Sequence, residues 1–182
     1  RKVLAHAGKS IEAFVNGGIA ELGDRLGPIN WQFPAHKSFE PDDFAAFLDL
    51  LPRSLDGRDL RHVLEVRHES FLCTQFIDLA RRHRVATVLT DSLTYPSFAD
   101  VTGDFMYLRL MRSESSIATG YPEKSLDAWA ERTRDWARGD GPADRPRVAQ
   151  TPASAAAGDA VDDSIRTAQE RNPAARVEGR PR

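Results

Sequence analysis

The sequence predicts an α/β fold, in which helices cover a parallel sheet. Four short apolar segments have the length and composition of buried strands, and amphipathic segments with apolar side chains at three- and four-residue steps precede, separate and follow them. Short connections between such elements favour a parallel sheet, because parallel strands need a crossover that is usually helical. The 182 residues are 41% hydrophobic, enough for one domain with its own core. The expected strands are residues 29–33, 64–68, 86–91 and 105–110.

The first two helices flank the first strand. Apolar side chains recur at helical spacing over residues 9–26, so we expect one helix there, with a kink at Gly17-Gly18 because glycine is a poor helix former. Pro41 suits the first turn of a second helix, since its ring fixes a helical φ and the two following aspartates favour the positive end of the helix dipole. Pro52 ends that helix.

Two serines are candidate caps for the later helices. Ser70 is expected to begin the third helix and Ser125 the fourth, because serine side chains accept hydrogen bonds from first-turn amides. Residues 139–182 then contain no Leu, Phe, Trp, Tyr or Met, and such a segment buries too little apolar surface to offset its ordering entropy. We therefore expect a folded domain over residues 1–138 and a disordered tail over residues 139–182.

Charge and composition narrow the classes of partner. A net charge of −2 provides no long-range attraction to nucleic acid or to an anionic membrane, which argues against both as partners. The chain has one cysteine and no apolar run of membrane-spanning length, so we expect a reduced, cytoplasmic setting. No motif points to a particular cofactor.

Several segments together resemble a known family, the YecE-like family, also called domain of unknown function family 72, over residues 1 to about 138. The resemblance implies a TIM-like (β/α) barrel without an established activity. Compared with the family, the chain lacks elements before Arg1 and a closing strand after the last helix, so we expect a fragment that supplies about half of a barrel. The segments that carry the resemblance are residues 27–34, 64–71, 104–110, 120–121 and 126–130.

Two charges in the second expected strand point to a site. Side chains alternate along a strand, so Glu65 and Arg67 share one face, and Leu64, Val66 and His68 share the other. The outer face of a parallel barrel packs under helices, where an unpaired charge is costly, so the charged pair is expected to face the barrel interior near the carboxyl ends of the strands. Catalytic groups of such barrels usually lie at those ends.

The neighbouring strand ends supply further polar groups. Tyr107 and Arg109 share one parity, and Gln32 and Asp91 complete an expected ring. Two arginines suit a phosphate or carboxylate, and a carboxylate suits proton transfer or ligation, so we expect an enzyme site for a small anion. The candidate catalytic residues are Glu65 and Asp91, and the candidate substrate-binding residues are Gln32, Arg67, His68, Tyr107 and Arg109.

The same residues allow other interpretations. In one alternative, the charges form an interior salt-bridge network that binds no ligand. In another, His68 joins Glu65 and Asp91 as a metal ligand, but the spacing of these residues gives this little support, and a histidine that caps the following helix is the competing interpretation. A noncatalytic binding module or an inactive barrel fragment is the alternative function, and its incomplete edge would favour self-association. The connection over residues 112–123 is either a ligand-covering loop or a solvated one.

Overall fold

The computed structural model describes residues 3–141 and residue 148. Its centre is a parallel sheet of four strands in the order β1-β4-β5-β6, which matches the four strands expected from the sequence. In the described residues β1 and β6 are the edge strands, so the sheet is open on both sides. The strands are β1 (Ile29–Gln32), β4 (His62–Glu65), β5 (Ala86–Thr90) and β6 (Tyr107–Arg109).

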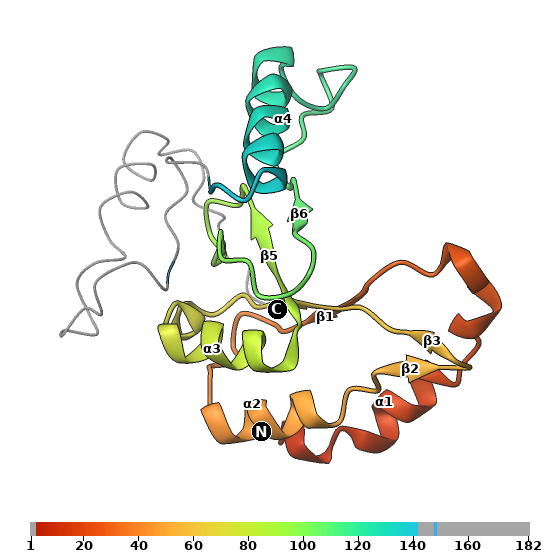
Figure 1. Cartoon of the computed structure of the whole chain (residues 1–182). Coiled ribbons are helices and arrows are strands. Elements are labelled where there is room, and N and C mark those ends of the chain that lie inside the picture. Colours follow the sequence, from red (N-terminus) through yellow and green to blue (C-terminus); the bar gives the residue numbers. More distant parts are fainter. Residues whose placement is uncertain (1–2, 142–147, 149–182) are drawn as a thin grey trace, which may run out of the picture.

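Helices pack along the sheet (Figure 1). The α-helices are α1 (Gly8–Val15), α2 (Pro41–Asp49), α3 (Thr74–His83) and α4 (Glu123–Ala137), and the short 3₁₀ helices are η1 (Leu4–His6), η2 (Ile19–Arg25) and η3 (Glu69–Phe71). Helices α1, α2 and α3 lie together, whereas α4 stands at the far end beside β5 and β6. No helix lies between β5 and β6 in the described residues; instead Phe98 from this connection fills the core.

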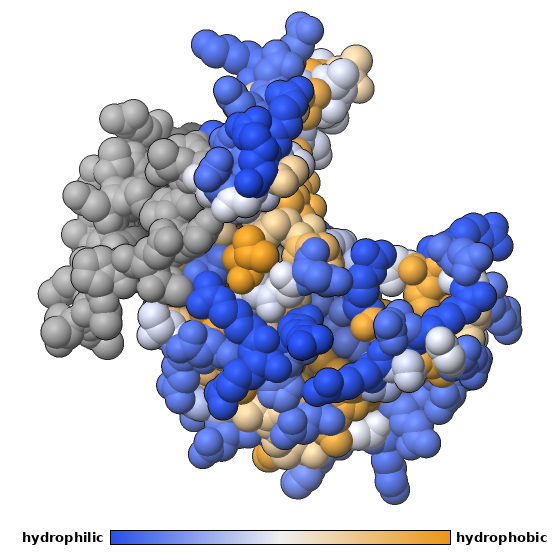
Figure 2. Space-filling model, viewed as in Figure 1, coloured by the Kyte–Doolittle hydropathy of each residue, from blue (hydrophilic) through white to orange (hydrophobic). Residues whose placement is uncertain are grey.

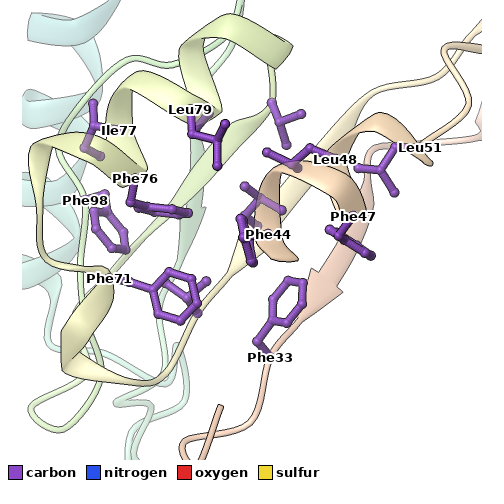
Figure 3. Close-up of a cluster of buried hydrophobic side chains, with 14 of the residues drawn as sticks. Phe33, Phe44, Phe47, Leu48, Leu51, Phe71, Phe76, Ile77, Leu79 and Phe98 are labelled. Atoms are coloured by element: carbon purple, nitrogen blue, oxygen red, sulfur yellow. The ribbon is translucent and has the colours of Figure 1, made fainter. Parts of the chain in front are cut away.

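Phenylalanine side chains fill the space between α2, α3 and the outer face of the sheet (Figure 3). Phe44 and Phe76 lie 5.7 Å apart between ring centroids, and Phe71 contacts both rings. Each ring is fully buried and contributes about 1.5–3 kcal/mol relative to exposure. Leu64 from β4 belongs to this cluster, which places the neighbouring Glu65 on the opposite, interior face of the sheet.

Three local predictions were wrong. The single helix over residues 9–26 is instead α1 followed by η2, because Gly18 adopts a left-handed φ of 107° that no helix continues through. Neither Ser70 nor Ser125 is the N-cap of its helix. The N-cap residue is Cys73 in α3 and Pro122 in α4. The apolar spacing located these helices but did not identify the residues at which they begin.

A small hairpin between α2 and β4 was not predicted. Strands β2 (Ser54–Leu55) and β3 (Arg58–Asp59) pair antiparallel around Asp56-Gly57, and both turn residues have positive φ. An Asp-Gly pair is a strong hairpin signal, since both positions of this turn type need left-handed backbone. The expected tail over residues 139–182 lies almost entirely outside the described residues.

Candidate functional site: a carboxylate between two arginines

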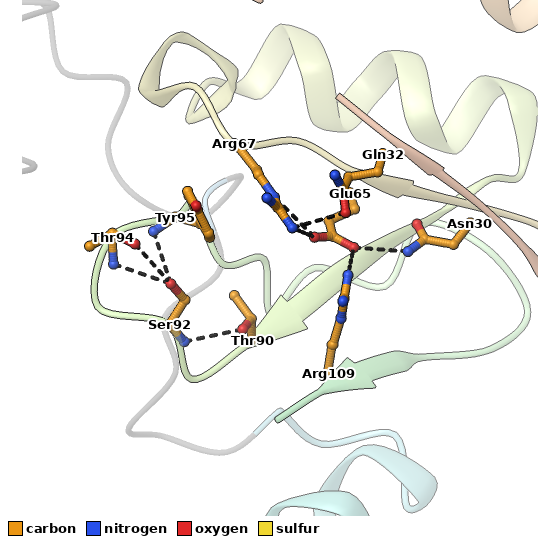
Figure 4. A network of polar contacts seen from close by, with 9 residues as sticks. All are labelled: Asn30, Gln32, Glu65, Arg67, Thr90, Ser92, Thr94, Tyr95 and Arg109. Atoms are coloured by element: carbon orange, nitrogen blue, oxygen red, sulfur yellow. Dashed lines mark hydrogen bonds and ion pairs between the residues drawn. The ribbon is translucent and has the colours of Figure 1, made fainter. Parts of the chain in front are cut away.

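Glu65 is the centre of a charged cluster at the carboxyl end of the sheet (Figure 4). It is the last residue of β4 and is 4% exposed. Arg67 donates to its Oε1 from Nε at 3.2 Å and from Nη2 at 2.9 Å, while Arg109 at the end of β6 donates from Nη1 to Oε2. Asn30 of β1 also donates to Oε2, at 2.8 Å. Strands β1 and β6 and the segment just after β4 therefore bring hydrogen-bond donors to one buried carboxylate.

The cluster keeps Glu65 ionised. Burial by itself would raise the pKa of the carboxyl group, but the hydrogen bonds from Asn30, Arg67 and Arg109 outweigh burial and hold the pKa below its ordinary value. Breaking such a buried pair is costly, because the remaining charge is left without compensation. At neutral pH the group is a carboxylate, which accepts protons or hydrogen bonds and donates none.

Arg67 is fixed on three sides. Besides the fork on Glu65, its Nη2 donates to Gln32 Oε1 at 2.9 Å, and its guanidinium lies 4.6 Å from the centroid of the Tyr95 ring. The side chain is 20% exposed, and its Nη1 has no hydrogen-bond partner in the part of the chain that the structure describes. A cation on an aromatic face is stabilised by about 0.5–1 kcal/mol at exposed sites and by more where water is excluded.

Arg109 is more open than Arg67. Its side chain is 39% exposed, and Nη1 is the nitrogen that contacts Glu65. Within residues 3–141 and Val148, its Nε and Nη2 have no hydrogen-bond partner. Two guanidinium groups and one carboxylate together carry a charge of +1, so the cluster has donors and charge left over for an anion.

The other predicted binding residues lie nearby in different settings. Gln32, expected in a ring at the strand ends, and Arg109 both join the cluster. Tyr107 shares the face of Arg109 but is half-buried and packs on Val88 and its neighbours. His68 caps η3 instead: its Nδ1 accepts the Ser70 amide at 3.1 Å, which is the capping alternative that the sequence left open.

Asp91 belongs to a separate network. Its Oδ1 accepts the Met111 amide at 2.7 Å, and its Oδ2 accepts the Tyr121 hydroxyl at 2.7 Å. That hydroxyl also accepts the amide of Arg112, and burial together with the hydrogen bond to Asp91 raises the pKa of Tyr121. Asp91 thus ties the loop after β6 to the end of β5. The structure does not bring it into hydrogen-bond contact with Glu65.

A metal centre is not assembled by these residues. No group of three His, Cys, Asp or Glu side chains in the described part of the chain lies close enough to hold a metal ion. His68 is turned toward Ser70, and the donors around Glu65 are cations and an amide, which compete with a metal for the same oxygens. The described cluster suits an anion.

Two residues of the site were missed by the sequence reasoning. Asn30 shares the parity of Gln32 on the first strand, so the alternation of β1 could have identified it. Its Oδ1 is buried without a hydrogen-bond partner among the described residues, while the carboxylate of Glu65 fixes which end of the amide is the donor. Tyr95 lies in the loop after β5, and no spacing in the sequence marks it.

Comparisons with known proteins agree with this architecture. A solved DUF72 family protein from Thermotoga maritima MSB8 superposes with a TM-score of 0.58 at 16% sequence identity, over 74% of this chain. The chain spans 55% of that protein's length. At this identity the likeness concerns the fold alone: a parallel sheet of four strands with helices in the connections from β1 to β4 and from β4 to β5 and after β6, as in part of a TIM-like barrel. No curated protein matches the chain.

In the described residues, no helix combines the length and the apolar composition needed to span a bilayer.

The family assignment rests on the sequence. The model of the family described as "Protein of unknown function DUF72" matches residues 1–180, and the match continues well past residue 138, where the resemblance read from motifs ended. The YecE-like family is this same family, so that resemblance is confirmed. The chain belongs to the DUF72 family.

Proposed function

We propose that the protein binds a small anionic molecule at the carboxyl ends of its strands, with Arg67 and Arg109 as the anion-binding groups. One observation carries this proposal: guanidinium groups from two chain segments meet at one buried carboxylate and still keep N–H donors without partners among the described residues. Arginine forks match the geometry of carboxylate and phosphate oxygens. In TIM-like barrels, the same end of the sheet usually holds the ligand.

Glu65 and Asp91 remain the proposed proton-transfer groups. Glu65 suits the role of proton acceptor or positioning anion, because its lowered pKa keeps it ionised at neutral pH. Asp91 stands at the end of β5 with its hydrogen bond from Tyr121, beside a loop suited to cover a ligand. Gln32, His68 and Tyr107 are proposed contacts around the same edge of the sheet.

The test compares two arginines. Thermal unfolding of the whole chain is followed by circular dichroism with a panel of small phosphates and carboxylates at constant ionic strength. One anion of the panel should raise the melting temperature of the native protein and of Arg58→Ala, since Arg58 is exposed and pairs with Asp24 away from the cluster. Arg109→Ala should lose that rise and keep nearly the same melting temperature without a ligand, because Arg109 is 39% exposed.

Two outcomes would contradict the proposal. If no anion of the panel shifts the native melt, the cluster is no binding site. If Arg109→Ala lowers the ligand-free melting temperature steeply, the two arginines form a structural salt-bridge network, which the geometry around Glu65 also allows.

A noncatalytic role is the second candidate. The observation that favours it is the open sheet, whose edge strands in the described residues are β1 and β6. Exposed strand edges pair readily with other chains, so self-association through an edge is the partner proposal that accompanies this alternative. Apolar side chains also reach the surface between α4 and the rest of the molecule (Figure 2). Sedimentation at several protein concentrations tests the partner proposal: a monomer throughout would exclude self-association through an edge.

A further inference from the structure

We infer that the anionic group bound between Arg67 and Arg109 is a carboxylate rather than a phosphate. This inference rests on the proposed anion site and names the chemical class of its ligand. Three properties of the described residues carry it: the shape of the donors that remain on Arg109, the charge of the cluster, and the state of the backbone amides at the same edge of the sheet.

The open donors of Arg109 form a planar fork. A guanidinium presents Nε and Nη2 side by side, and these are the two nitrogens that lack partners in residues 3–141 and Val148, while Nη1 is held by Glu65. Two parallel N–H groups at this spacing match the two oxygens of one carboxylate. The Nη1 of Arg67, a side chain held by Gln32 and Tyr95, is a further open donor of the same cluster in the described part of the chain.

The charge of the cluster suits a single negative charge. Arg67 and Arg109 carry two positive charges and Glu65 one negative charge, which leaves +1. A carboxylate neutralises that remainder. A phosphate dianion would leave a net negative charge beside a carboxylate that is only 4% exposed, where repulsion is weakly screened.

Several backbone amides of the loops at this edge are already occupied within the described residues. Phosphate sites commonly use backbone N–H groups at a helix N-terminus or in a turn. Here side chains already accept six such amides, which reduces the backbone donors available to a phosphate, whereas the guanidinium donors of Arg109 remain open among the described residues. The occupied amides are those of Ser70 on His68, Ser92 on Thr90, Thr94 and Tyr95 on Ser92, Met111 on Asp91, and Arg112 on Tyr121.

The experiment is an NMR titration of the native, full-length chain labelled with ¹⁵N. Acetate and inorganic phosphate are added separately at mildly alkaline pH, where phosphate is mainly a dianion, with sodium chloride holding the ionic strength constant. The Nε–H resonance of Arg109 should shift with acetate at an affinity about tenfold higher than with phosphate. The Nε–H resonance of Arg58, which pairs with Asp24 outside the cluster, serves as the control and should respond to neither anion.

A variant that keeps the charge tests the fork. Arg109→Lys retains the positive charge but has no paired, coplanar donors, so the preference for acetate, followed in this variant at the Nε–H resonance of Arg67, should disappear while weak binding of both anions remains. If Arg109→Lys keeps the full preference for acetate, the argument from the fork is overturned.

The other outcomes separate this inference from the function on which it rests. If phosphate binds as tightly as acetate or more tightly, the carboxylate inference is overturned and the anion site stands. If neither anion moves the Arg109 resonance while the protein is folded, both are overturned.

Discussion

Replacing Glu65 with glutamine removes the one negative charge that the two arginines share. The substitution keeps the shape of the side chain, so the effect comes from charge. Loss of one partner of a buried pair costs about 3–5 kcal/mol when the other charge stays buried. Arg67 and Arg109 are 20% and 39% exposed and regain water, so the free energy of unfolding should fall by about 1–3 kcal/mol.

Anion binding should change in the opposite direction. The cluster goes from a charge of +1 to +2, and Arg67 keeps its contacts with Gln32 and Tyr95, so the affinity for acetate should rise by about tenfold. Urea unfolding followed by circular dichroism measures the stability, and the NMR titration measures the affinity. Asp24→Asn is the matched control, because it removes the almost fully exposed partner of Arg58 and should cost at most about 1 kcal/mol.

Acidic pH gives a second readout of the same residue. The pKa of Glu65 is lowered in the folded protein, so its stabilising effect is complete above the ordinary pKa near 4.5 and is lost as the pH falls toward the folded value. The stability difference between native protein and Glu65→Gln should therefore shrink as the solution is acidified. Equal stability of the two proteins at neutral pH, or a difference that does not depend on pH, would refute this account of the cluster.

Three further predictions concern other parts of the molecule. Phe44→Ala should lower the free energy of unfolding in urea by about 3–5 kcal/mol, because the fully buried ring leaves a cavity; a loss below about 1 kcal/mol would contradict the packing. Burial lowers the pKa of His62, whose Nδ1 accepts from the Trp31 indole, so stability should fall as the pH drops below about 6.5, and His62→Gln should lack that pH dependence in thermal melts. Tyr121→Phe removes the hydroxyl that joins the loop to Asp91, and hydrogen exchange at that loop should accelerate by about fivefold, whereas unchanged rates would show that the contact does not hold the loop.

The sequence predicted the sheet well because strand signals are local. Strands β1, β5 and β6 lie within the expected segments, since an apolar run of strand length is buried by almost any arrangement of the helices around it. The second strand was expected over residues 64–68, but β4 begins earlier and spans His62–Glu65, so Arg67 and His68 follow the strand instead of belonging to it. Helix boundaries were harder. Gly17-Gly18 was expected to bend one helix, but the left-handed φ of Gly18 divides it, and a choice between a kink and a break depends on what packs on either side.

The sequence by itself determined which residues of the site share a face. Strand alternation puts Glu65 opposite Leu64, and it gives Gln32 and Arg109 the parity with which they join the cluster. It could not decide which groups meet, because that depends on the register between strands and on the path of the loops. Register brings Arg109 across β5 to Glu65, the loop after β5 brings Tyr95 onto Arg67, and Asp91 is occupied instead by the loop after β6. Such contacts join residues far apart in the chain, and only the tertiary structure specifies them.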